Sequence, residues 1–133
     1  MQRMKNDKRG FTLFELLAVM LIMSILAAIA VPSYKRSQIK AKETVLAEDL
    51  YQMRKAIDAF YADNLRYPED LEELAETKYL RSIPVDPFTR SNTSWICIEP
   101  EIDDNGDLTE GNCYDIHSGS DIIGLNNQAY QDW

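Results

Sequence analysis

The chain has 133 residues, a formal net charge of −8, one histidine and two cysteines. Residues 1–10 carry four basic side chains against one acidic one, so the remaining residues sum to −11. This acidic surface argues against nucleic acid as a partner, and two thiols with one histidine are too few ligands for a structural zinc site. The length allows one small domain preceded by a helical segment.

The first predicted element is an apolar helix. Residues 16–31 contain no charge, and their single polar side chain is Ser24. The 21 residues from Phe11 to Val31 would span roughly 31 Å as a helix, about the thickness of a bilayer core. The basic tip before them is typical of a flank that stays cytoplasmic. Composition leaves three interpretations open: a cleaved secretory signal, a plain membrane anchor, or a class III prepilin signal.

Two features bear on these three interpretations. Ala28-Ile29-Ala30 has the small-x-small pattern that signal peptidase prefers. Glu15 argues against a simple signal or anchor, because a carboxylate at mid-membrane costs about 2.5–3.5 kcal/mol. An acid in such a segment indicates a functional role and requires a partner for its charge.

The segment Lys8-Arg9-Gly10-Phe11-Thr12-Leu13-Phe14-Glu15-Leu16 resembles the type IV prepilin signature. In that signature a basic leader and a glycine precede an aromatic residue, Thr-Leu, a variable residue and a glutamate. The resemblance implies that residues 1–10 are a leader that a prepilin peptidase removes after Gly10, and that the new amine of Phe11 is methylated. Glu15 is then expected to pair with the Phe11 amine of a neighbouring subunit, since two buried charges satisfy one another.

The helix is expected to continue beyond the membrane segment. Pro32 lies where pilin stems carry a proline, and no Gly or Pro follows until the Tyr67-Pro68 pair that ends the helical region. Apolar residues recur there at three- and four-residue steps, which predicts a stripe that packs on a globular domain. The stripe comprises Ile39, Leu46, Leu50, Met53, Ile57 and Phe60.

The remaining elements are short. Residues 69–75 predict an acidic helix, and residues 94–98 and 113–117 predict two strands, with a tight turn at Asn105-Gly106 between them. The predicted fold is therefore α+β. A long N-terminal helix, half transmembrane and half amphipathic, precedes a small antiparallel sheet. The expected divisions are a leader at 1–10, a membrane and assembly helix at 11–32, and a periplasmic part at 33–133.

Cys97 and Cys113 fall in the two predicted strands. One pair of cysteines in a chain with an export segment is compatible with a disulfide formed outside the cytoplasm. Adjacent antiparallel strands would bring the two within bonding range. Two free thiols are the alternative.

The order of elements, together with residues 114–121 and 130–133, resembles the major pseudopilins of type II secretion. Many of those proteins bind one calcium in the C-terminal loop, which makes Asp121 and Asp132 the candidate ligands here. Segment 122–127 has isoleucine and asparagine where the calcium-binding members place further aspartates. The alternative is a loop held by Trp133 packing and backbone hydrogen bonds.

No enzymatic function is expected. The sequence has no glycine-rich phosphate loop, no nucleophile elbow and no metal-spaced histidines, and His117 is interpreted as a structural residue of a strand. The resemblance implies a structural subunit of a periplasmic pseudopilus that drives protein secretion across the outer membrane. The alternatives are a type IV pilin of a surface fibre and an anchored or exported binding module.

The same resemblance implies the partners and the location. The expected partners are further copies of the chain, minor pseudopilins, the prepilin peptidase and the inner-membrane assembly platform. The expected location is the inner membrane, crossed once, with the C-terminal domain in the periplasm before assembly into a periplasmic or surface filament.

Overall fold

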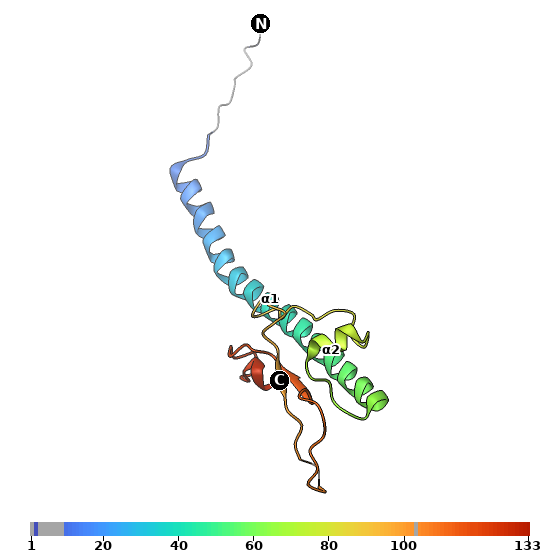
Figure 1. The fold of residues 1–133 in the computed structure, drawn as a ribbon. Coiled ribbons are helices and arrows are strands. Elements are labelled where there is room, and N and C mark those ends of the chain that lie inside the picture. The colour runs from blue at the N-terminus through green and yellow to red at the C-terminus, as the bar shows by residue number, and fades with distance from the viewer. Residues whose placement is uncertain (1, 3–9, 103) are drawn as a thin grey trace. The chain divides into compact units, whose positions relative to one another are not determined.

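The computed structural model describes residues 2, 10–102 and 104–133, so most of the expected leader lies outside the described residues. The chain divides into two compact units, one ending at Gln38 and one spanning Ile39–Trp133. The long helix and the two-stranded antiparallel sheet confirm the α+β fold (Figure 1). The elements are α1 (Leu13–Asn64), α2 (Leu71–Glu76), β1 (Ile96–Ile98), β2 (Asp115–His117) and the 3-10 helix η1 (Tyr130–Asp132).

The first unit is the apolar beginning of α1. From Phe11 to Gln38 every side chain is exposed except Ala18, which is half-buried. Pro32 lies inside the helix, and helical residues continue on both sides of it. The Ser24 hydroxyl donates to the carbonyl of Met20 at 2.8 Å, so the one polar side chain of the apolar run is satisfied within its own helix.

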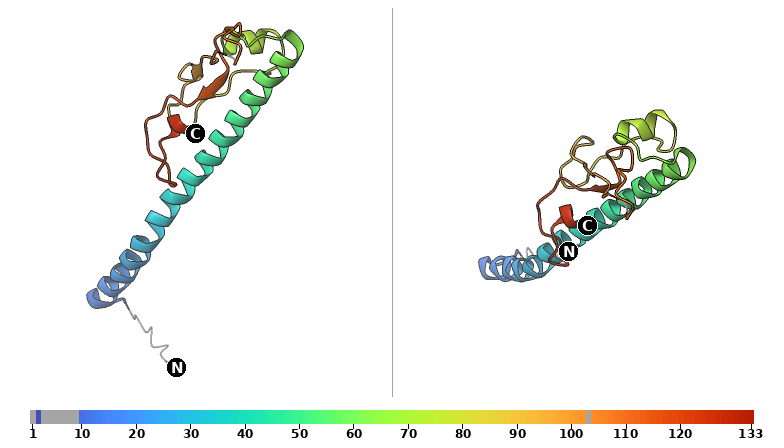
Figure 2. Two further views of the ribbon diagram at one scale, coloured as in Figure 1. Left: turned by 90° about the horizontal axis from the view of Figure 1, so that it is seen from below. Right: turned by 60° about the horizontal axis from the view of Figure 1, so that its bottom comes forward.

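The second unit is built on the apolar stripe of α1. Figure 2 shows α2 beside the last turns of this helix, with the strands and η1 also along it. The predicted stripe is buried except at its start, because Ile39 is 38 % exposed and takes no part in the core. The core comprises Leu46, Leu50, Met53, Ala56, Ile57 and Phe60 from α1, with Leu71, Leu74, Leu80, Trp95, Cys113, Ile116 and Tyr130.

The two strands are shorter than the sequence predicted. Ile96 pairs with His117 and Ile98 with Asp115, so each strand has only three residues. Cys113 therefore precedes β2, and the residue opposite Cys97 is Ile116. The disulfide between Cys97 and Cys113, with Cα atoms 4.8 Å apart, links β1 to the segment that leads into β2.

The connection between the strands is anchored at its base to the segment that follows α1. Tyr67 donates its backbone N–H to Glu110 at 2.9 Å, and Cys113 donates to the carbonyl of Pro68 at 3.0 Å. Gly111 has a φ of +101°, and a Cβ there would lie 2.0 Å from the carbonyl oxygen of Tyr67. Only glycine allows this approach of two backbones. Gly106 has a φ of +80° in the turn predicted at Asn105-Gly106.

A buried carboxylate joins the proline-rich loop to the segment after β2. Asp86 is fully buried, accepts the N–H of Phe88 at 2.8 Å, and accepts the hydroxyl of Ser118. The Ser118 oxygen in turn accepts the N–H of Ser120 at 3.1 Å. A buried carboxylate needs such donors, so these contacts define how the two loops meet.

Candidate assembly and processing site

The N-terminus of α1 is shaped by a local capping interaction. The Thr12 hydroxyl oxygen accepts the backbone N–H of Glu15 at 3.2 Å, and the Thr12 carbonyl accepts that of Leu16 at 3.1 Å. Thr-x-x-Glu is a known capping pattern, because a threonine side chain satisfies a helical N–H that has no partner within the helix. The helix therefore begins directly after Thr12, and Gly10 and Phe11 remain outside it.

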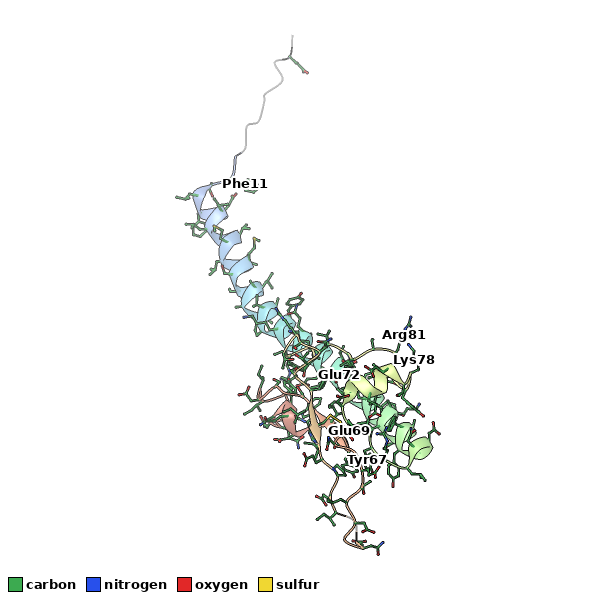
Figure 3. All side chains as sticks on the ribbon, in the orientation of Figure 1. Phe11, Tyr67, Glu69, Glu72, Lys78 and Arg81 are labelled. Carbon is green, nitrogen blue, oxygen red and sulfur yellow. A yellow bond between two sulfur atoms is a disulfide. The ribbon has the colours of Figure 1, made fainter. Side chains whose placement is uncertain are left out.

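The bond expected to be cleaved lies in accessible, non-helical backbone. Figure 3 shows Phe11 immediately before the first turn of α1. The Phe11 side chain is 89 % exposed, and Gly10 has no atom within 4 Å of the position of a Cβ. A peptidase can therefore reach the Gly10–Phe11 bond without unwinding the helix.

Glu15 lies in the first turn of α1, one helical turn from Phe11. Among the ion pairs of the residues that the structure describes, none involves Glu15. Its charge needs a partner wherever this turn enters an apolar environment, and none of the described residues supplies one as an ion pair.

The apolar side chains that follow Glu15 also need contacts that the single chain does not provide. Among the described residues there is one helix, α1, that is long and apolar enough to cross a membrane. Because none of its membrane-length window is buried within the chain, lipid or other helices must cover it. Exposed basic residues follow this run, and none of them takes part in an ion pair among the described residues: Lys35, Arg36, Lys40 and Lys42.

The two candidate calcium ligands lie on neighbouring segments. Gln131 donates its N–H to the carbonyl of Ser120 at 3.0 Å, which brings the residues around Asp121 close to those around Asp132. Both aspartates are exposed. Within the described parts of the chain, no group of three or more His, Cys, Asp or Glu side chains is placed to hold a metal ion. Calcium usually takes six to eight oxygens with several carboxylates, so this donor set does not fit it.

His117 and Ser118 each contact an aspartate within the domain. Ser118 is fully buried, and its hydroxyl donates to Asp86. The Nε2 atom of His117 lies 3.4 Å from Asp115, and its Nδ1 atom is buried without a hydrogen-bond partner.

Two residues of α1 that the sequence did not single out organise the C-terminal part. Arg54 donates to Asp115 at 2.8 Å, to the carbonyl of Ile116 at 3.0 Å, and to the main-chain oxygen of Trp133 at 2.6 Å. Glu43 accepts two hydrogen bonds from residues more than 80 positions away. No local pattern marks either residue, because each lies among ordinary charges on a solvated helix.

Comparison with known proteins first defines the class. A family model described as the prokaryotic N-terminal methylation motif matches residues 5–31, which include Gly10, Phe11 and Glu15. No solved structure gives a significant match.

Curated relatives then define the particular family. The chain is 35 % identical over 100 residues to the type II secretion system core protein G of Pseudomonas aeruginosa, covering 63 % of this chain and 70 % of that protein. It is 31 % identical to the protein of the same name from Klebsiella michiganensis, with the same coverage. The type IV major pilin protein PilA of Myxococcus xanthus is 35 % identical over 72 residues, 54 % of this chain and 33 % of that pilin. The chain belongs to the type II secretion system core protein G family.

Proposed function

We propose that this chain is a structural subunit of a type II secretion pseudopilus, matured by cleavage after Gly10 and assembled through Glu15. The observation that carries the proposal is the Thr12-capped first turn of α1. It presents Glu15 one turn from an exposed, non-helical bond, at the start of an apolar helix that the single chain leaves uncovered. Membership of the core protein G family and the match to the methylation motif support the same function.

The proposed assembly step follows from the charges that cleavage creates. Removal of residues 1–10 leaves a cationic amine on Phe11, which the peptidase methylates. A second copy displaced along the filament axis brings its Phe11 amine to the Glu15 carboxylate of the first. Each charge then has a partner inside an apolar bundle, and the pairing determines the register between subunits.

The proposed location is the inner membrane, with the acidic unit in the periplasm. The basic residues before Gly10 support a cytoplasmic N-terminus. The disulfide between Cys97 and Cys113 supports an oxidising compartment for the rest. Further copies of the chain, minor pseudopilins, the prepilin peptidase and the assembly platform are the proposed partners. The relatives are named as components of a secretion system, which supports a structural and not a catalytic role.

Mass spectrometry of the mature N-terminus tests the processing step. We expect methylated Phe11 as the first residue, partial processing of Gly10→Ala, and no processing of Gly10→Arg, because a bulky side chain blocks closure of the peptidase on the backbone. A first residue at Val31 or Ser33 would indicate an exported module, and a retained Met1 a plain anchor. Efficient maturation of Gly10→Arg would contradict the proposal.

A subunit of a long surface fibre is the second candidate, favoured by the similarity to the Myxococcus pilin. Both candidates share the N-terminal chemistry, so imaging must separate them. We expect a labelled subunit to appear in short filaments confined to the periplasm. Long fibres outside the cell at native expression would favour the pilin.

A further inference from the structure

The C-terminal loop closes on itself before it meets the rest of the domain. Ile123 and Ala129 form an isolated antiparallel bridge. Gly124 donates its N–H to the carbonyl of Gln128 at 2.7 Å, and Asn127 donates to the carbonyl of Gly124 at 3.1 Å. These bonds define the shape of the loop but leave its position on α1 to other contacts.

One oxygen of Glu43 supplies such a contact. The Oε1 atom accepts the backbone N–H of Leu125 at 2.8 Å and the hydroxyl of Tyr130 at 2.8 Å. Both bonds are charge-assisted, which makes them stronger than bonds between neutral groups. Glu43 therefore connects α1 to the tip of the loop and to the first residue of η1.

Gly124 lies close to both Glu43 and Tyr130. A Cβ on Gly124 would lie 2.9 Å from the Glu43 carboxylate oxygen and 2.9 Å from the Tyr130 ring. A side chain at position 124 would therefore have to displace the Glu43 carboxylate or the Tyr130 ring, and either shift would disturb the contact.

Packing and burial fix the Tyr130 side chain, whose hydroxyl donates to Glu43. Its side chain is 1 % exposed, and its ring stacks on Phe88 with centroids 3.8 Å apart. Burial, followed by the hydrogen bond to Glu43, raises the pKa of Tyr130 to about 12. The hydroxyl consequently keeps its proton at neutral pH.

The groups that converge on Glu43 are donors, and a metal ion would need acceptors. An N–H and an O–H point at the carboxylate, whereas calcium requires carbonyl and carboxylate oxygens turned toward it. Asp121 and Asp132 remain exposed on the surface, without a third acidic ligand among the described residues.

We propose that the Glu43 carboxylate anchors the C-terminal loop of this chain to α1, so that the loop is ordered without a divalent cation at Asp121 and Asp132. The interaction is internal to one subunit. Its test is therefore independent of filament assembly and of processing at Gly10.

The first test uses the unaltered full-length chain in detergent. Thermal unfolding and proteolysis of segment 120–130, mapped by mass spectrometry, are measured in EDTA and in excess calcium chloride. We expect the same unfolding midpoint and the same cleavage rate in both. A higher midpoint or slower loop cleavage in calcium would overturn the proposal, as would saturable calcium binding by calorimetry. This comparison needs no variant.

The second test removes the carboxylate. Glu43→Ala should raise the rate of cleavage within 120–130 by roughly tenfold or more, because two bonds to a charged group are lost. The matched control is Glu48→Ala, since Glu48 is exposed on the same helix and accepts a hydrogen bond from Gln52, one turn further along that helix. The control should leave the cleavage rate unchanged. Unchanged cleavage in Glu43→Ala would show that Glu43 does not anchor the loop.

Discussion

Three carboxylates of this chain differ in the partners that satisfy their charge. Asp86 is buried and satisfied by backbone N–H groups and a serine hydroxyl. Glu43 is shared between two loop donors. Glu15 makes no ion pair among the described residues, although it lies at the start of an apolar helix. A charge in that position needs a partner, and none of the described residues supplies one, so Glu15 is the residue at which assembly is most easily tested.

Replacing Glu15 by leucine should separate insertion from assembly. Glu15→Leu removes an acid that is costly in the membrane, so the monomer should insert at least as well as the parent. Cleavage after Gly10 should persist. The neighbour's Phe11 amine would be buried without a partner, at a cost of about 3–5 kcal/mol per contact, so filaments should be scarce or absent. The measurement is the amount of subunit in sheared filaments relative to the membrane fraction.

The control for this prediction is Ser24→Leu, an equivalent change on the same exposed helix that removes no charge. It should leave the filament yield close to that of the parent, because the Ser24 hydroxyl is satisfied by the Met20 carbonyl of its own helix. Glu15→Leu filaments of normal length and yield would mean that the charge pair does not organise assembly.

Among the elements, α2 illustrates how a short helix depends on its caps. It has only six residues, too few to be stable alone. Asp70 caps it by accepting the N–H of Glu73 at 2.9 Å. Glu73 reaches back to the N–H of Glu69 at 2.8 Å and pairs with Arg66 at 2.5 Å. Leu71 and Leu74 bury its inner face.

The Glu73 contacts predict a pH dependence of stability. The hydrogen bond from Arg66, assisted by the N–H of Glu69, lowers the pKa of Glu73 below its ordinary value of 4.5. A carboxyl with a lowered pKa in the folded state stabilises that state above its ordinary pKa, and the contribution is lost as the pH falls through the folded pKa. Glu73→Gln should therefore unfold at lower urea than the parent at pH 7, with a difference that closes in acid below pH 4.5.

The control is Glu72→Gln, because Glu72 is exposed on the same turn. It should change the urea midpoint little at either pH. A Glu73→Gln difference that stays constant from pH 7 into strong acid would show that ionisation of Glu73 does not stabilise the domain.

At the scale of the whole molecule, the second unit is held together by one core and by one covalent bond. The sheet has only two three-residue strands, and a sheet of that size contributes little stability alone. The disulfide links positions 16 apart in the sequence and fastens β1 to the buried segment at Cys113. The Arg54 contacts attach β2 and Trp133 to α1 in the same region.

Removal of the disulfide should destabilise this unit substantially. The doubly substituted Cys97→Ala, Cys113→Ala chain should lose about 3 kcal/mol in the chain-entropy model, measured by urea unfolding. Reducing the unaltered chain with dithiothreitol is the control, since it breaks the bond without changing side-chain volume, and should give a similar loss. Free thiols in protein purified without reductant would contradict the pairing of Cys97 with Cys113.

Much of this protein follows from local sequence. The Thr12 cap, the apolar run and the periodic stripe of α1 involve residues three or four positions apart, so a linear pattern records them. The α+β class and the prepilin-like N-terminus were predicted on that basis. The strands were predicted too long, because their ends depend on which neighbours pair.

Only the tertiary structure revealed how the C-terminal part is held. Glu43 and Tyr130 are 87 positions apart, and Arg54 and Trp133 are 79 apart. Neither pair has a periodicity or motif that marks it in advance. The choice of partner is made when α1 and the loop are packed together, because the donor that reaches a carboxylate is determined by distance in space and not by spacing along the chain.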